Sequence, residues 1–296
     1  SFGSMLTSIG ANTFTGCTNV REVYISNLLH WCSNINFNNT QTSNPLANGV
    51  AGLYLNNGLV TDLKGVASLS TVQPYAFYGY NHFVNLTIPN TMTKIGTRAF
   101  QNCANLKFLT VNGSASGVID TYAFFGCTSL ATLEIKNGVT TIGNYAFQNN
   151  TSLSTITLAA VTSIGTGAFQ GASTLSTIDF GTALTTINPN AFMNCTSLAE
   201  VAIPTTVTNM GASSFGGCTA LEKLTLAFLG NTPTDSNTLG YIFGNTAVSG
   251  LTYGVTQTTS YQLPLSLKTV IVLGGNIPNY AFKGANSLTS ITLPRV

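Results

Sequence analysis

Phenylalanine recurs through the chain at an almost constant spacing, and this period limits the folds open to the chain more than any other feature. The successive intervals are 23, 24, 23, 22, 23 and 23 residues. The residues that define them are Phe77, Phe100, Phe124, Phe147, Phe169, Phe192 and Phe215. Phe14 and Phe282 carry the same surrounding signature beyond less regular stretches. A sustained period of about 20–29 residues indicates a repeat architecture.

Positions at fixed distances from the phenylalanine keep the same residue type. An aliphatic residue or methionine stands five residues before it, and a small residue, mostly alanine, stands one before. Only glycine or asparagine stands two residues after it, and these types best tolerate the left-handed conformation that ends a helical turn. Leucine usually stands six residues after it. Strand-forming residues stand nine and eleven after it and alternate with polar ones, which is the period of a strand.

Each repeat therefore predicts a short helical turn that holds the phenylalanine, followed by a short strand such as "LSTITL". No single repeat closes a core, but stacked repeats form a parallel sheet and an interior column of phenylalanines. We expect one solenoid over residues 1–296, with regular repeats at 72–226, irregular stretches at 26–71 and 227–276, and repeats again at 277–294. Because the chain begins and ends in mid-pattern, we expect a fragment of a longer protein.

The repeated string I-G-x-x-A-F-x-G/N-C-x-S-L-x-x-I-x-L-P resembles the leucine-rich repeat of the BspA-like type. "IDTYAFFGCTSLATLEI" and "INPNAFMNCTSLAEVAIP" match it almost position for position. The resemblance covers most of the chain. It implies a leucine-rich-repeat solenoid with one parallel β-sheet on the concave face and short helical or 3-10 turns opposite. It also implies a bacterial or protist surface protein with an adhesin-like role, since the family is associated with attachment to host matrix proteins, host cells or other microbes.

The two irregular stretches carry local signals of their own. In the first, Asn57-Gly58 between alternating apolar residues signals a hairpin. In the second, "SLKTVIVL" keeps the strand spacing and indicates a degenerate repeat. Either stretch is a set of loops and hairpins that covers one side of the solenoid, or it is a ligand-binding projection, since long insertions in repeat proteins often carry function.

Five of the six cysteines stand three residues after the repeat phenylalanine, in a position that elsewhere holds alanine, asparagine or tyrosine. They are Cys17, Cys103, Cys127, Cys195 and Cys218. A free thiol in a small, partly buried slot is one interpretation. Disulfides between adjacent coils, Cys103 with Cys127 and Cys195 with Cys218, are a second. A metal site is a third, although the chain has no C-x-x-C motif and no histidine near these residues.

Composition and motifs exclude several classes of function. Only 6% of the residues are charged and the net charge is +2 without a Lys/Arg cluster, which argues against nucleic-acid binding. No apolar run approaches the roughly 18 residues of a transmembrane helix. The chain lacks G-x-S-x-G, H-E-x-x-H and Walker motifs, and neither His30 nor His82 has a catalytic partner at a recognisable spacing. We expect no enzymatic activity, cofactor or metal in this segment.

The strand residues eight and ten positions after the phenylalanine are expected to point outward and to pave the concave face. Most are threonine, which suits an exposed sheet without any function. The exceptions are aromatic or charged, and such groups on a rigid surface are usual anchors of recognition. The candidate binding residues are Tyr24, Phe108, Glu134, Asp179, Glu200 and Lys223.

Three function classes follow. The first is a non-enzymatic module of a secreted or cell-surface protein that binds a protein or glycoprotein on the concave face and mediates adhesion. The second is a structural spacer or self-assembling surface or filament protein, because a surface with so few charges lacks repulsion and solenoid ends expose open edges. The third, an enzyme that uses the repeats as a targeting arm, needs a catalytic domain outside this segment.

Overall fold

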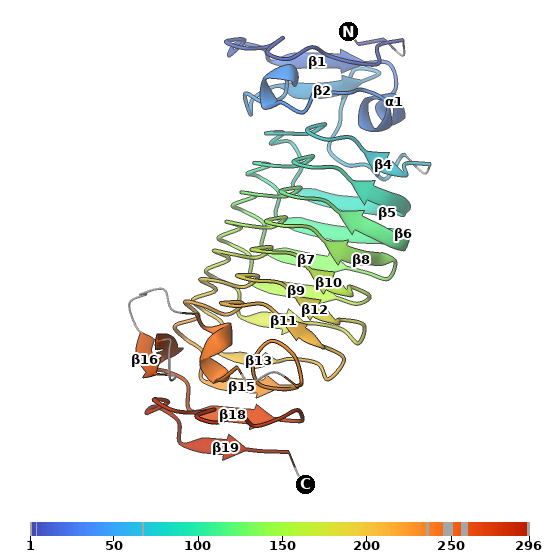
Figure 1. Cartoon of the computed structure of the whole chain (residues 1–296). Coiled ribbons are helices and arrows are strands. Elements are labelled where there is room, and N and C mark those ends of the chain that lie inside the picture. Colours follow the sequence, from blue (N-terminus) through green and yellow to red (C-terminus); the bar gives the residue numbers. More distant parts are fainter. Residues whose placement is uncertain are drawn as a thin grey trace.

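The computed structural model describes residues 2–3, 5–66, 68–234, 237–244, 251–255 and 260–294, with the backbone alone for 251–255 and 260–262. Parts of the second irregular stretch, 235–236, 245–250 and 256–259, lie outside the described residues. The chain winds into coils that stack along one axis from the N-terminal to the C-terminal end (Figure 1). The leucine-rich-repeat solenoid expected from the sequence is confirmed.

A parallel ladder runs along one side of the stack and takes one strand from each coil. Its strands are β1 (Glu22–Ile25), β2 (Gly52–Leu55), β5 (Asn85–Ile95), β6 (Phe108–Ile119), β7 (Thr132–Ile135), β9 (Thr155–Leu158), β11 (Thr177–Asp179), β13 (Glu200–Ala202), β15 (Lys223–Leu226), β18 (Thr269–Val272) and β19 (Ser290–Thr292). We call the outward surface of these strands the ladder face. Hydrogen bonding divides it into three sheets, because β2 turns back into the short strand β3 (Gly58–Leu59) and β11 ends the central sheet before β13 begins the next.

A second parallel ladder, which the sequence did not predict, contains the aliphatic residue or methionine that stands five residues before each repeat phenylalanine. It consists of β4 (Thr71–Val72), the second halves of β5 and β6, β8 (Val139–Ile142), β10 (Ser163–Ile164), β12 (Thr186–Ile187) and β14 (Asn209–Met210). Most of these pairs combine a polar residue, often threonine, with a buried aliphatic one, and β-branched residues favour the extended backbone. Each regular coil is therefore held to its neighbours on two sides.

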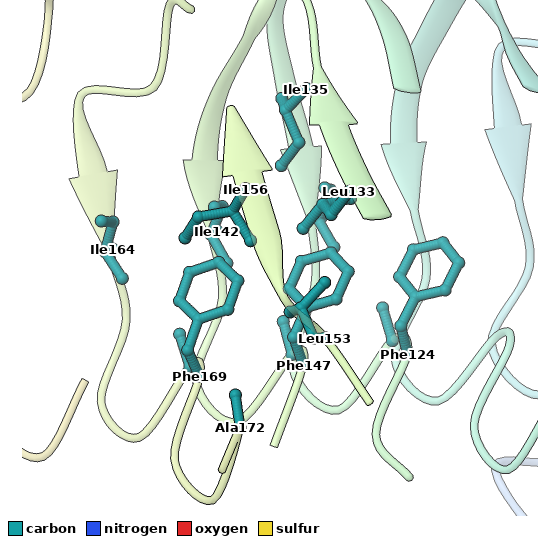
Figure 2. Packing of buried hydrophobic residues seen from close by; sticks show 14 of the residues in the cluster. Phe124, Leu133, Ile135, Ile142, Phe147, Leu153, Ile156, Ile164, Phe169 and Ala172 are labelled. Atoms are coloured by element: carbon teal, nitrogen blue, oxygen red, sulfur yellow. The ribbon is translucent and has the colours of Figure 1, made fainter. Parts of the chain in front are cut away.

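The repeat phenylalanines form the expected interior column. From Phe77 to Phe215 each ring stacks on the next, with centroids 4.9–5.3 Å apart and interplanar angles of 1–9°. Each of these rings is fully buried, and Figure 2 shows three of them between the leucines and isoleucines of the two ladders. Burial of each ring contributes about 1.5–3 kcal/mol.

The part of each regular coil around the repeat phenylalanine is a hydrogen-bonded turn, and we call this side of the molecule the turn side. Backbone N–H groups of successive residues there donate alternately to a carbonyl of the next coil and to a carbonyl of the same coil. In one coil the Phe100 N–H donates to the Ala123 carbonyl at 2.8 Å, while the Gln101 N–H donates to the Arg98 carbonyl at 3.2 Å. The glycine or asparagine two residues after the phenylalanine has a positive φ in every repeat, as expected. The residue two before it also has a positive φ, for example 57° at Tyr122 and 56° at Tyr145, which its residue type did not indicate.

The first irregular stretch is a full coil with inserted elements, and it contributes to the core. It contains α1 (Leu28–Ser33) and the short helix η1 (Gln41–Ser43). Trp31 of α1 is fully buried, and its indole N–H donates to the Ala76 carbonyl at 3.1 Å. The predicted hairpin is confirmed by the antiparallel pairing of β2 with β3, although the two turn residues with positive φ are Asn56 and Asn57.

The second irregular stretch is a coil with the same winding path as the regular coils, into which a β-hairpin is inserted. It contains η2 (Leu239–Ile242) and the antiparallel strands β16 (Leu251–Val255) and β17 (Ser260–Pro264). The Phe215 N–H donates to the Ile242 carbonyl, so Phe243 takes the position of the repeat phenylalanine in the backbone, and it is buried. Strand β18 pairs in parallel with β15, with Lys223 opposite Thr269, which confirms that "SLKTVIVL" is a degenerate repeat.

All six cysteines are free thiols, and five are buried. In four coils the thiol lies against the preceding coil; Cys127, for example, donates to the Phe100 carbonyl at 3.3 Å. Burial raises the pKa of the Cys103 and Cys195 thiols well above the ordinary value, and that of Cys218 to about 12. Cys17 departs from the expected partly buried slot and is exposed.

Candidate binding face

The ladder face presents two outward columns whose members lie in register. Residues eight after the phenylalanine pair across the central strands, as Asn85 does with Phe108 and Phe108 with Thr132. Residues ten after it do the same, as Glu134 does with Thr157. Outward residues alternate with fully buried ones along β7 and β9. The sequence therefore located the outward positions of the central sheet correctly, and most of them are threonine.

Phe108 is the most exposed aromatic residue that these columns contribute. Its side chain is 52% exposed, although the next residue, Leu109, is buried in the core. Strand β6 pairs with β5 on one side and β7 on the other, so the backbone that carries this ring is held without support from the ring itself. Val84, which precedes β5 and accepts a backbone hydrogen bond from Phe108, is also 44% exposed. These two exposed apolar residues interrupt the polar residues that predominate on this part of the face.

Glu134 lies on the strand next to Phe108 and already has two partners. The Thr110 hydroxyl, directly opposite on β6, donates to its carboxylate at 3.3 Å. The ammonium group of Lys136 lies 3.6 Å from the same carboxylate. Both charged side chains are about half exposed, so solvent screens the pair and it contributes little to stability. Glu134 therefore stands diagonally across from Phe108, two residues beyond Thr132, which lies directly opposite Phe108 on β7.

Glu200 and Lys223 are brought together as an ion pair on the sheet that follows. They stand opposite each other on β13 and β15, and the ammonium nitrogen lies 2.5 Å from a carboxylate oxygen. Both side chains remain largely exposed. Exposed pairs of this kind contribute about 0–1 kcal/mol, so the pair stays available for exchange with charges on another molecule.

Tyr24 lies on the N-terminal sheet, apart from the other candidates. Its hydroxyl donates to the Glu22 carboxylate at 2.9 Å, and this hydrogen bond raises the pKa of the Tyr24 phenol. Its ring stacks on Tyr54 at a centroid distance of 5.3 Å. Tyr54 stands opposite Tyr24 on β2 and belongs to the same outward column. Sequence reasoning missed Tyr54 because it lies in a stretch that breaks the period, although "GLYL" keeps the alternation of a strand.

Asp179 completes the candidate set but is isolated from the other five. It lies on β11, the last strand of the central sheet. Its carboxylate accepts the backbone N–H of Gly181 at 2.9 Å, as in a turn-stabilising aspartate. The structure therefore groups Phe108 with Glu134 and Glu200 with Lys223, and it places Tyr24 and Asp179 elsewhere.

The remaining polar groups give no sign of a catalytic or metal centre within the described ranges. No three His, Cys, Asp or Glu side chains gather closely enough to hold a metal ion in that part of the chain. The ring nitrogen Nε2 of His30 lies 2.6 Å from the Leu6 carbonyl, and the His82 ring packs near Tyr80. None of the described helices is long and apolar enough to cross a membrane.

The chain belongs to the BspA-type leucine-rich-repeat family. The family model, described as a BspA type leucine rich repeat region, matches six copies over residues 1–47, 54–160 and 117–246. Members of this repeat class are typically non-enzymatic binding scaffolds, and membership suggests that the chain is a protein-binding module. No curated protein matches the chain.

A search of solved structures finds similarity to several leucine-rich-repeat proteins. A leucine-rich-repeat protein of T. pallidum is 20% identical over 75% of this chain and 72% of its own, with a TM-score of 0.42. One from Bacteroides ovatus is 22% identical over 75% of this chain and 64% of its own, with a TM-score of 0.41. A leucine-rich cell surface protein of Faecalibacterium prausnitzii is 21% identical over 99% of this chain and 78% of its own, with a TM-score of 0.38.

Proposed function

We propose that this chain is the adhesive region of a secreted or cell-surface protein and that it binds a protein or glycoprotein of a host matrix, a host cell or another microbe through the ladder face. The observation that carries the proposal is Phe108, a half-exposed aromatic ring on a rigid strand with an acidic neighbour, Glu134. Aromatic residues at the centre of an interface supply most of its binding energy. Family membership supports a protein partner.

The six candidate residues divide this face into a principal and a secondary contact. Phe108 and Glu134 form the principal contact, since an apolar ring with a charged group diagonally across from it gives both affinity and orientation. Glu200 and Lys223 form the secondary contact, whose charges steer the partner and make binding salt-dependent. Tyr24 extends the face to the N-terminal sheet, and Asp179 extends it to the last ladder strand of the central sheet.

Surface-immobilised matrix proteins and intact cells provide the test. Wild-type chain is expected to bind at least one of them saturably, and Phe108→Ala is expected to weaken this binding by about 2 kcal/mol or more. Thr155→Ala is the matched control, because Thr155 occupies the same outward column two coils further on. Absence of saturable binding by folded wild-type chain would exclude adhesion through this segment.

Self-association is a second candidate function, and one observation favours it. Only 6% of the residues are charged, so little electrostatic repulsion keeps copies of the chain apart. We propose that copies of the chain associate with one another. Light scattering at increasing concentration is expected to show growing particles; a monomer at high concentration would count against assembly.

A further inference from the structure

The turn side of the molecule is interrupted at one coil. The Phe14 N–H donates to the Thr42 carbonyl at 2.9 Å, as the Phe100 N–H does to the Ala123 carbonyl, so Ser43 takes the place of the repeat phenylalanine. We call this the Ser43 coil. Its residues 43–46 are all buried, whereas residues 15–18 of the coil before it are exposed. The Ser43 coil is therefore recessed relative to its neighbour.

Pro45 explains why this coil does not follow the usual path. It stands two residues after Ser43, where regular coils have glycine or asparagine with a positive φ. Proline is restricted to a negative φ and has no N–H, so the left-handed residue of the regular turn and the backbone hydrogen bond that it donates to the next coil are both missing here. The Ser43 N–H donates to the Thr40 carbonyl of its own coil, and the Asn44 side chain instead donates to the Ala76 carbonyl of the next coil at 3.0 Å. The chain then turns inward to the buried Leu46.

The recess forms a cavity of about 510 Å³ between the turns of neighbouring coils. Asn44 and Pro45 lie among the lining residues that the Ser43 coil provides. Thr15 and Thr18 line it from the preceding coil, and Tyr78 and Asn81 line it from the following one. We call this cavity the turn notch.

The walls of the turn notch combine polar and apolar surface, carry no charged side chain and are in part held rigid. No Asp, Glu, Lys, Arg or His lines it. The Asn48 amide donates to the Val20 carbonyl at 2.9 Å and the Asn81 amide to the Gly49 carbonyl at 3.1 Å, so both side chains are fixed by backbone groups. The phenol of Tyr78 accepts a hydrogen bond from the Asn102 amide at 3.2 Å. These contacts define the shape of the cavity before any ligand enters.

Other polar groups of the same walls are free for a ligand. The side chains of Thr15, Thr18 and Gln41 are exposed, and none of them hydrogen-bonds to another described residue. A hydroxyl and an amide can each donate and accept. Three such groups therefore face a cavity whose remaining polar side chains are largely held in place.

We propose that the turn notch binds a neutral carbohydrate. Sugar hydroxyls also donate and accept, so they match the free threonine hydroxyls and the Gln41 amide. An ionic ligand would lose water without gaining an opposite charge, and a wholly apolar ligand would cover the polar part of the walls without hydrogen bonds; both carry a desolvation cost. A sugar has both hydroxyl groups and C–H faces, so it matches walls that are part polar and part apolar. An extended peptide is disfavoured because it pairs with strand edges, and the residues that line the notch belong to turns and to η1.

This inference is independent of the proposed adhesion through the ladder face. None of the notch residues belongs to a ladder strand, so a variant on one surface leaves the other unchanged. Failure of one proposal therefore leaves the other standing.

Cys17 allows the notch to be tested directly, since it lines the cavity and is exposed whereas the other five thiols are buried. The probes are tetrasaccharides of β-1,4-linked glucose, α-1,4-linked glucose, mannose and N-acetylglucosamine, together with a neutral Gly-Ser hexapeptide. The measurements are calorimetric binding and the rate at which N-ethylmaleimide alkylates Cys17. At least one sugar is expected to bind saturably and to slow alkylation.

Two substitutions in the same column of the repeat separate notch binding from binding elsewhere. Thr18→Trp fills the notch and is expected to weaken sugar binding at least about tenfold, or about 1.4 kcal/mol. Thr128→Trp is the matched control, because Thr128 also stands four residues after a repeat phenylalanine and is exposed, and it is expected to bind as wild type. The proposal is overturned if no sugar binds, if only the peptide protects Cys17, or if both variants bind equally.

Discussion

The regular coils at 72–226 and the Ser43 coil before them follow the same winding path but differ at the turn. In the regular coils, a phenylalanine fills the interior and a glycine or asparagine turns the chain, so each turn bonds to the next and leaves no gap. In the Ser43 coil, serine replaces the phenylalanine and Pro45 replaces the turn residue. Trp31, from an inserted helix, is buried in the same part of the core and contacts Phe37.

This difference shows how a solenoid separates stability from function. A residue repeated in every coil reports on packing, because each coil meets the same neighbours. A residue that departs from its column alters the surface at one place. Phe108 on the ladder face and Pro45 on the turn side are departures of this kind, and each marks a proposed binding surface.

Removal of one interior ring tests whether the residues repeated in every coil determine stability, and it has the largest expected effect. Phe147→Ala leaves a gap in a continuous stack and is expected to lower the free energy of unfolding by about 3–5 kcal/mol. Chemical denaturation followed by circular dichroism measures the loss. The control is Thr157→Ala on the ladder face, expected to change stability by less than about 0.5 kcal/mol. Similar losses in both variants would contradict the separation.

The turn column provides a smaller test. Gly217 has a φ of 73°, and a Cβ there would lie against the Asn194 side chain of the preceding coil. Gly217→Ala is expected to cost about 1–2 kcal/mol for the left-handed backbone alone. Addition of Asn194→Gly removes the clash and is expected to restore part of the stability. Equal stability of the single and double variants would show that the two coils do not meet as described.

The buried thiols of the regular coils are expected to make the free energy of unfolding depend on pH. The pKa of Cys218 is raised from 9.0 to about 12, so above pH 9 the unfolded chain loses this proton before the folded chain does. The free energy of unfolding is therefore expected to fall by about 1.4 kcal/mol per pH unit for this thiol above pH 9. Cys218→Ala is expected to reduce the slope measured between pH 9 and 10. An unchanged slope would contradict a buried, protonated thiol.

The sequence predicted the structural features whose residues recur in every repeat, and it missed most of those that arise where a residue or a stretch departs from the repeat. The phenylalanine column, the left-handed turn column and the outward threonines all follow from residue types that recur in each coil. The left-handed residue two before the phenylalanine was missed, because tyrosine occupies it in four repeats and rarely adopts that conformation.

The turn notch and the outward Tyr54 were missed for a related reason. Tyr54 and the Ser43 coil, which forms the middle of the notch, belong to the stretch 26–71, where helix α1 shifts the numbering of the columns. Only the hydrogen bond from Phe14 to Thr42 and the pairing of Tyr24 with Tyr54 restore the alignment. Contacts between distant residues carry that information, and a single sequence does not display them.

The central claim is that Phe108 serves binding and not folding, and one paired measurement tests it most directly. Wild-type chain and Phe108→Ala are compared for the free energy of unfolding and for saturable binding to immobilised matrix proteins and cells. The prediction is stability unchanged within about 0.5 kcal/mol and binding weakened by about 2 kcal/mol or more. Unchanged binding, or a loss of stability comparable to that of Phe147→Ala, would contradict the claim.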